Sequence, residues 1–214
     1  MSDMVDRGGL LKILLGQVQS MPSGSRLIVA IAGAPASGKS AVSDWLCDAF
    51  NRVHPESAAI LPMDGYHYDD AVLTAHGSLQ QKGAPHTFDV GGLVSILKRL
   101  RENTEAQIAV PRFDRDLEIA RAGAVIIQSK AQLIIVEGNY LLLKQEPWQQ
   151  LLSLFDLKIL VSVEEQVLEQ RLRDRWTSYN LEETDIQRKV FENDLPNGRL
   201  VIRESAQPDI VVSN

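Results

Sequence analysis

A segment near the start of the chain has the residue types and spacing of a phosphate-binding loop. Residues 33–40, GAPASGKS, fit the pattern GxxxxGK(S/T) in full. The glycines at both ends allow the backbone to turn successive N–H groups onto phosphate oxygens, the lysine reaches the β- and γ-phosphates, and the serine hydroxyl ligates Mg²⁺. We therefore predict that ATP and Mg²⁺ bind here, on the following residues: Gly33, Ala34, Ala36, Ser37, Gly38, Lys39, Ser40 and Ala41.

Two carboxylates stand at the ends of apolar runs that are typical of strands. Asp64 follows residues 58–63 and Glu137 ends residues 133–137. Ligands of open α/β sheets bind at the carboxyl ends of the strands. A carboxylate beside a triphosphate either holds Mg²⁺ or accepts a proton from the attacking hydroxyl. We assign Asp64 as the candidate base and Glu137, with Ser40, as a candidate metal ligand; the exchanged assignment, with Asp64 at the metal, stays open. Purely structural roles also stay open: Asp64 could form a turn with Gly65, and Glu137 could cap a helix or lie on the surface.

Arg171 and Arg175 lie one helical turn apart in a segment whose apolar side includes Leu168 and Leu172. The first interpretation is a lid that supplies positive charge to the transferring phosphoryl group. The second is a solvated helix face whose arginines pair with nearby carboxylates. Arg173 points away from the other two in either case.

The elements that must position these residues alternate along the chain. The pattern predicts an α/β fold with a mainly parallel sheet and helices on both faces, of the three-layer type that carries such phosphate loops. Residues 64–88 and the charged stretch PRFDRDLEIARAG (111–123) have weak periodicity and are predicted as functional loops. The predicted strands span 26–33, 58–63, 106–111, 124–128, 133–137, 157–163 and 209–213, and the predicted helices 4–20, 39–52, 89–101, 147–154, 163–176 and 180–194.

Composition excludes several classes of protein. The 214 residues suit one domain, and 44% hydrophobic residues are enough for a sizeable core. The single cysteine, Cys47, excludes an intramolecular disulfide framework, and the net charge of −6 argues against coating nucleic acid. No stretch reaches the roughly 18 apolar residues of a membrane helix, and the acidic N-terminus does not resemble a secretory signal. We therefore expect a cytoplasmic protein that binds neither nucleic acid nor membrane.

The motifs occur in an order that resembles a known group of enzymes. The phosphate loop, MDGYH, PRFDR, EGNYLLL and RLRDRW, over about residues 26–200, look like the uridine kinase, pantothenate kinase and phosphoribulokinase branch of P-loop kinases. KGAPHTFDV, VEGNYLLL and NDLPN are most similar to a bacterial subgroup described as uridine-kinase-like or fructose-transport-system kinases. Gly65 and His67 depart from the usual uridine kinase acid motif; DGYH is closer to pantothenate kinases, which are longer chains.

This resemblance implies roles for individual residues. Asp64 would be the catalytic acid/base, Glu137 would lie near Mg²⁺, and Arg171 and Arg175 would be lid arginines. Asn193 would lie toward the adenine. The residues implied to contact the acceptor, or predicted to do so from their place in the same motifs, are Tyr66, His67, Arg112, Asp114, Asn139 and Tyr140.

We therefore expect one kinase domain over residues 1–214 that transfers the γ-phosphate of ATP to a hydroxyl of a small sugar-like or nucleoside-like metabolite. It would comprise an N-terminal helix (1–22), acceptor segments (64–88 and 111–123) and lid helices (164–195). The alternatives are a pantothenate kinase-like activity and an ATPase or nucleotide switch without an acceptor. The N-terminal helix could cover the sheet edge or form a homodimer contact.

Overall fold

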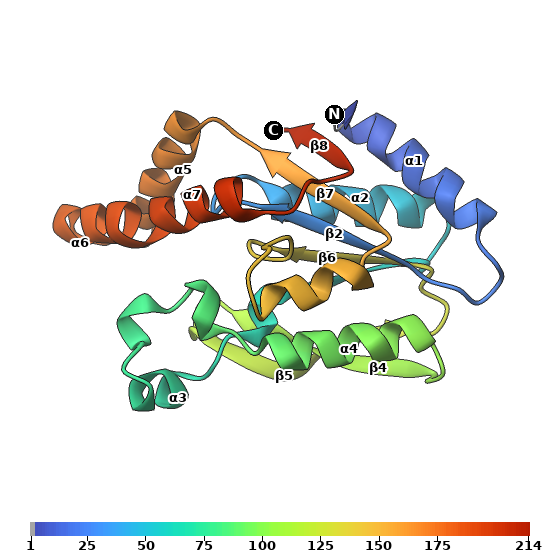
Figure 1. Ribbon diagram of the computed structural model, residues 1–214, viewed down its shortest axis with the longest axis horizontal. Coiled ribbons are helices and arrows are strands. Elements are labelled where there is room, and N and C mark those ends of the chain that lie inside the picture. The colour runs from blue at the N-terminus through green and yellow to red at the C-terminus, as the bar shows by residue number, and fades with distance from the viewer. Residues whose placement is uncertain (1–2) are drawn as a thin grey trace.

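The centre of the protein is a parallel sheet. The computed structural model describes residues 3–214, so the first two residues of the predicted N-terminal segment lie outside it. Within this range the sheet has six strands (Figure 1). Their spatial order is β1 (Asp3–Met4), β8 (Ile210–Ser213), β7 (Leu157–Ser162), β2 (Leu27–Gly33), β6 (Leu133–Gly138) and β3 (Ala58–Pro62). The predicted α/β class with a mainly parallel sheet is confirmed.

Helices cover both faces of the sheet because each central strand is apolar on both sides. Along β2, Leu27, Val29 and Ile31 pack into one buried cluster, while Ile28 and Ala30 pack into the opposite one. The first cluster lies under α1 (Arg7–Ser20) and α2 (Lys39–Val53). The second lies under α4 (Val90–Glu102) and the 3-10 helix η4 (Trp148–Leu154). Helix α1 therefore packs on one face of the sheet, whereas the first of the two interpretations placed it at the sheet edge. No described helix is long and apolar enough to cross a membrane.

The charged stretch 111–123 forms more strand than we predicted. β4 (Gln107–Asp114) and β5 (Ile119–Gln128) make an antiparallel hairpin beside the main sheet, and only residues 115–118 turn. The prediction of a loop was wrong because cross-strand pairing organises charged residues that show no apolar periodicity; Arg112, for example, stands opposite Arg121.

Residues 64–88 are also more regular than a loop. They contain α3 (Asp70–Ala75) and three 3-10 turns, η1 (Met63–Tyr66), η2 (Leu79–Gln81) and η3 (Pro85–Thr87). Asp69 caps α3 by accepting a hydrogen bond from the Ala71 amide, and Leu73 is fully buried. A polar segment with isolated apolar anchors gives little periodic signal, which is why these turns were missed.

The C-terminal helical region extends past its predicted end at residue 194. After α5 (Glu165–Ser178) come α6 (Glu183–Arg188), a π-helical turn η5 (Lys189–Asp194) and α7 (Leu195–Glu204), which follow one another as one rod (Figure 1). By residue type, Pro196 and Gly198 would be expected to end a helix. The π-turn ends at Asp194, and Pro196 stands in the first turn of α7, where a residue without an N–H to donate is tolerated, so the helical path continues.

A buried arginine ties three parts of the fold together. Arg26, 1% exposed, donates hydrogen bonds to the carbonyls of Leu100 (2.9 Å), Gln128 (2.8 Å) and Ala131 (3.0 Å). These carbonyls belong to the end of α4, the end of β5 and the turn before β6. The guanidinium thus supplies the donors that buried carbonyls need.

We expect Arg26→Met to lower the free energy of unfolding by about 3 kcal/mol or more, because it removes the guanidinium donors from these buried carbonyls; the Gln128 carbonyl still accepts from the Ala131 amide. Urea unfolding measures the change. The matched control is Arg99→Met, which removes an exposed arginine paired with Glu105 and is expected to have a much smaller effect. Equal effects of the two substitutions would contradict this role of Arg26.

Candidate active site

The phosphate loop joins the end of β2 to the first turn of α2, as predicted. Gly38 has φ +85°, a left-handed conformation that residues with a side chain rarely adopt. None of the described side chains caps α2, so the amide groups of Lys39, Ser40 and Ala41 form an open helix N-terminus. Such a terminus attracts anions through free N–H groups and the helix dipole. The buried Ser37 hydroxyl also has no hydrogen-bond partner in the part of the chain that the structure describes.

Glu137 joins the lysine and the serine of this loop. Its Oε1 lies 3.6 Å from Lys39 Nζ and accepts a hydrogen bond of 3.2 Å from Ser40 Oγ. Burial raises the pKa of the Glu137 carboxyl, and the Lys39 charge opposes that rise. Carboxylate and hydroxyl oxygens are the ligands Mg²⁺ prefers. The pair Ser40 and Glu137 therefore fits an ion that would be completed by phosphate oxygens and water.

Strand order explains why Glu137 and Asp64 both lie near this loop. β6 runs between β2 and β3, and Glu137 stands beside Ile31 on one side and Pro62 on the other. Asp64 follows β3 directly, in the turn η1. The carboxyl ends of three neighbouring strands thus carry the phosphate loop and the two carboxylates, as the rule for open α/β sheets requires.

Asp64 is held by residues that are distant in sequence. Arg115, in the hairpin turn, donates to Asp64 Oδ2 at 2.8 Å, and the Asp64 side chain keeps 24% exposure. Gly65 is needed beside it because a Cβ there would meet the carbonyl of Pro111 at 2.6 Å. The close approach of η1 to β4 accounts for this glycine. The arrangement presents a partly open carboxyl group beside the cavity, in a position to accept a proton.

His67 lies between two aromatic rings, with ring centroids 4.0 Å from Phe88 and 4.7 Å from Phe113. Its Nδ1 is 2.7 Å from the backbone carbonyl of Asp64. Because a carbonyl oxygen only accepts, Nδ1 carries the proton. Burial lowers the pKa of His67 below its usual value, while the neighbouring Asp64 carboxylate opposes the shift. The neutral ring therefore offers Nε2 as a hydrogen-bond acceptor.

Stability is expected to decline as pH falls below the ordinary histidine pKa of about 6.5, because the unfolded chain then binds a proton that folded His67 resists. Replacing His67 with Asn, which keeps an N–H donor but no titrating ring, should reduce this part of the pH dependence. The measurement compares urea midpoints at about pH 7.5 and about pH 5.5 in both proteins. An unchanged difference between the two pH values would show that His67 is not the titrating group.

One cavity of about 660 Å³ connects the phosphate loop with Asp64. Its walls come from the loop, residues 64–88, the hairpin turn, the end of β6 and the C-terminal helical rod, and Figure 1 shows α3 and α5–α7 gathered at one end of the molecule. The lining residues are Pro35, Ala36, Lys39, Asp64, His67, Leu79, Gln80, Gln81, Lys82, Gly83, Phe88, Phe113, Arg115, Glu118, Asn139, Tyr140, Arg175, Trp176, Arg188, Lys189, Glu192, Asn193, Asp194 and Asn197.

Several predicted residues lie in this cavity. His67, Asn139, Tyr140, Arg175 and Asn193 all contribute to its wall. The Tyr140 hydroxyl donates to the Gly83 carbonyl at 2.6 Å, and Asn139 has a buried side-chain oxygen without a partner among residues 3–214. That unsatisfied oxygen is free to receive a donor from a ligand.

Other predicted contacts are not in the cavity wall. Tyr66 is 8% exposed and packs in the apolar cluster under α4. Arg112 is exposed, and Asp114 pairs with Arg121 at 3.3 Å. Alternation along the strand explains the correction, since Phe113 and Arg115 point to the side opposite Arg112 and Asp114. The PRFDR motif therefore meets the cavity through different residues than we expected.

The arginines of α5 have three different surroundings. Arg171 Nη1 lies 3.4 Å from the carbonyls of Ala36 and Ser37, so it contacts the phosphate loop without lining the cavity. Arg175 lines the cavity and stacks on Trp176, 5.1 Å from its ring centroid. Arg173 pairs with acidic side chains instead, as expected for the residue that points away.

Comparison with known proteins agrees with the geometry. Residues 28–179 match the model of the Phosphoribulokinase / Uridine kinase family. The "Putative uridine kinase C227.14" of Schizosaccharomyces pombe is 32% identical, over 91% of this chain and 86% of its own length. The "Uncharacterized protein YggC" of Escherichia coli is 33% identical, over 93% and 82%.

A solved structure is similar over nearly the whole chain. The crystal structure of a "putative fructose transport system kinase" from Silicibacter sp. TM1040 superposes with a TM-score of 0.89 at 33% identity. The match covers 97% of this chain and 98% of that one, so the fold and most of its insertions are shared. This chain belongs to the phosphoribulokinase / uridine kinase family and is an ATP-dependent P-loop kinase.

Proposed function

We propose that this kinase phosphorylates a hydroxyl of a small sugar-like or nucleoside-like metabolite, with ATP and Mg²⁺ as cosubstrate and cofactor. The observation that carries the proposal is the single cavity that reaches from Lys39 to Asp64. A triphosphate on the loop and an acceptor hydroxyl beside Asp64 would share this space. Similarity to the Silicibacter kinase supports a sugar, and similarity to the Schizosaccharomyces protein supports a nucleoside.

The chain's own residues account for the transfer. Asp64 orients the acceptor hydroxyl and takes its proton, a new O–P bond forms to the γ-phosphorus, and the bond from that phosphorus to the bridging oxygen breaks, leaving ADP. Lys39 and Arg175 offset charge that spreads over the phosphoryl oxygens, and Arg115 orients the Asp64 carboxylate through their ion pair. Ser40 and Glu137 would hold Mg²⁺, which when bound neutralises charge on the phosphates.

The substrate is tested by ATP consumption against a panel of acceptors. The panel contains fructose, other sugars, uridine, cytidine and pantothenate, each with Mg²⁺ present. We expect a sugar or a nucleoside to raise turnover well above the rate without acceptor, and stimulation by pantothenate instead would favour the third acceptor class. If no compound raises turnover, a nucleotide switch or ATPase without an acceptor replaces this proposal.

A further inference from the structure

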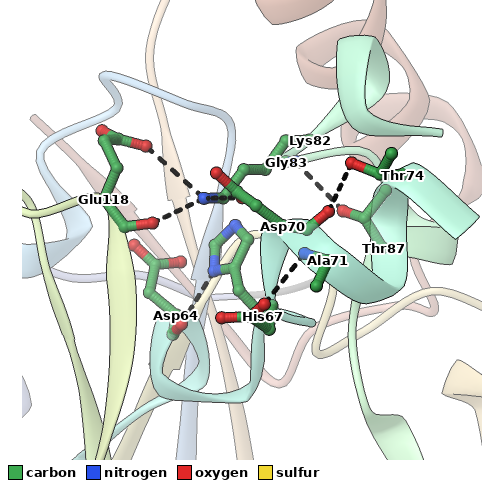
Figure 2. Close-up of polar contacts among 10 residues, drawn as sticks. Asp64, His67, Asp70, Ala71, Thr74, Lys82, Gly83, Thr87 and Glu118 are labelled. Atoms are coloured by element: carbon green, nitrogen blue, oxygen red, sulfur yellow. Dashed lines mark hydrogen bonds and ion pairs between the residues drawn. The ribbon is translucent and has the colours of Figure 1, made fainter.

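Lys82 lies where two separate walls of the cavity meet. Its Nζ is 2.6 Å from Asp70 Oδ1 and 2.6 Å from the backbone carbonyl of Glu118, and the Glu118 carboxylate is 3.9 Å away. Figure 2 shows this ammonium between Asp70, at the start of α3, and Glu118, the last residue of the hairpin turn. One side chain thus connects the segment 70–83 with the turn 115–118.

The surroundings of Lys82 distinguish it from an ordinary surface lysine. Its side chain is 16% exposed and its Nζ lies 5.3 Å from the ring centroid of Phe113. Exposed lysine–carboxylate pairs contribute little because water competes for both partners. Here the carbonyl and the aromatic ring restrict access by water, so the contact can hold the two walls together.

The ammonium also has a donor to spare. A lysine carries three N–H donors, and the two short contacts use two of them. Asp64 and His67 line the same part of the cavity, and in Figure 2 the free ring nitrogen of His67 points toward the space beside Lys82. A ligand there meets a donor and two acceptors within one small volume.

Carboxylates outnumber cations in this part of the cavity. The lining cations Lys82 and Arg115 stand against the lining anions Asp64 and Glu118 and against Asp70, which pairs with Lys82. An acidic acceptor would add a further negative charge and would compete with these three carboxylates for the two cations. A polyhydroxylated, uncharged acceptor instead matches the alternation of donors and acceptors without that cost.

We propose that Lys82 is a specificity-determining residue that closes the acceptor end of the cavity and donates its third N–H to an acceptor oxygen other than the one that is phosphorylated. The acceptor is therefore an uncharged compound with at least two hydroxyl groups. The hydrogen bond to the acceptor rests on the proposed function, because Lys82 can select an acceptor only where one is phosphorylated. The closure, by which Lys82 joins the segment 70–83 to the turn 115–118, does not depend on that function.

Steady-state kinetics test whether Lys82 selects the acceptor. Lys82→Met is expected to raise the KM for the best panel acceptor about tenfold, the loss expected for one hydrogen bond from a charged donor, with the KM for ATP unchanged. Lys130→Met is the matched control, since Lys130 pairs with Glu56 outside the cavity. Singly deoxygenated analogues of the acceptor locate the contact. One of them should be a poor substrate for the wild type and yet lose no further activity in Lys82→Met.

An equal effect of Lys82→Met on the full acceptor and on every analogue would overturn the hydrogen bond to the acceptor. A carboxylate-bearing acceptor that outperforms every uncharged one would overturn the assigned substrate class. A rise in the KM for ATP that matches the rise for the acceptor would indicate general damage to the cavity.

Hydrogen exchange of the ligand-free chain tests the closure without any acceptor. We expect faster exchange in residues 70–83 and 115–119 of Lys82→Met and, to a smaller extent, of Asp70→Asn, with no change in Lys130→Met. Unchanged exchange in both variants would overturn the closure. If the wild type phosphorylates nothing in the panel, the proposed function and the selection by Lys82 both fail, while this measurement still decides the closure.

Discussion

Replacing Asp64 with Asn is expected to lower kcat by about 10²–10⁴-fold with the best acceptor, the usual contribution of a positioned general base. The amide keeps the size of the carboxylate but cannot take the hydroxyl proton. Since Asp64 belongs to the turn after β3 and not to the open N-terminus of α2, the affinity for ATP should change little. Acceptor-dependent ATP consumption measures the first effect, and nucleotide titration by fluorescence or calorimetry measures the second.

The matched control for this prediction is Asp114→Asn. It makes the same chemical change close by, in β4, but Asp114 pairs with Arg121 and does not line the cavity. We expect near wild-type turnover from this control. Retention of near-full activity by Asp64→Asn would reject Asp64 as the base, and a large loss of ATP affinity would instead favour the exchanged assignment with Asp64 at the metal.

The phosphate loop and the two strand-end carboxylates could be predicted because local rules determine them. The GxxxxGK(S/T) pattern needs only contiguous residues, and the end of an apolar strand marks the edge of a parallel sheet where ligands bind. Glu137 and Asp64 meet the loop because β6 lies between β2 and β3. The residue types indicated that the two carboxylates would stand at strand ends, but the order of the strands depends on tertiary packing and could not be predicted from local sequence.

The acceptor end was harder to predict because its contacts depend on register and on distant pairs. Phe113 and Arg115 line the cavity, while Arg112 and Asp114 lie on the opposite side of β4, and the sequence does not show which side faces the cavity. Tyr66 is adjacent to functional residues in sequence but belongs to the core. Lys82 meets partners 12 and 36 positions away, and no local pattern reports such pairs.

The loop lysine gives the second large effect, and a double substitution separates its two roles. Lys39→Met is expected to lower kcat/KM for ATP by about 10²–10³-fold, the loss typical for a removed donor to a developing negative charge. It also leaves the buried Glu137 carboxylate without its cation, which should cost about 2 kcal/mol of unfolding free energy near neutral pH.

The sign of the pH effect follows from Glu137. Its folded pKa is already raised by burial, and loss of the Lys39 charge raises it further. The folded chain then holds a proton that the unfolded chain releases, so the destabilisation grows as pH rises above the ordinary glutamate pKa of about 4.3. Urea unfolding should therefore show a smaller cost of Lys39→Met at about pH 5 than at about pH 8.

Adding Glu137→Gln to Lys39→Met removes the unpaired charge and should restore most of the stability, together with its weak dependence on pH. Activity should stay lost, because the amide restores neither the contact of Lys39 with the phosphates nor a carboxylate ligand for Mg²⁺. Recovery of stability without recovery of turnover separates the role of Lys39 in balancing Glu137 from its role toward the triphosphate. Were the double variant as unstable as Lys39→Met alone, the ion pair would not be the source of the destabilisation, and lost packing of the lysine stem against the loop would have to account for it.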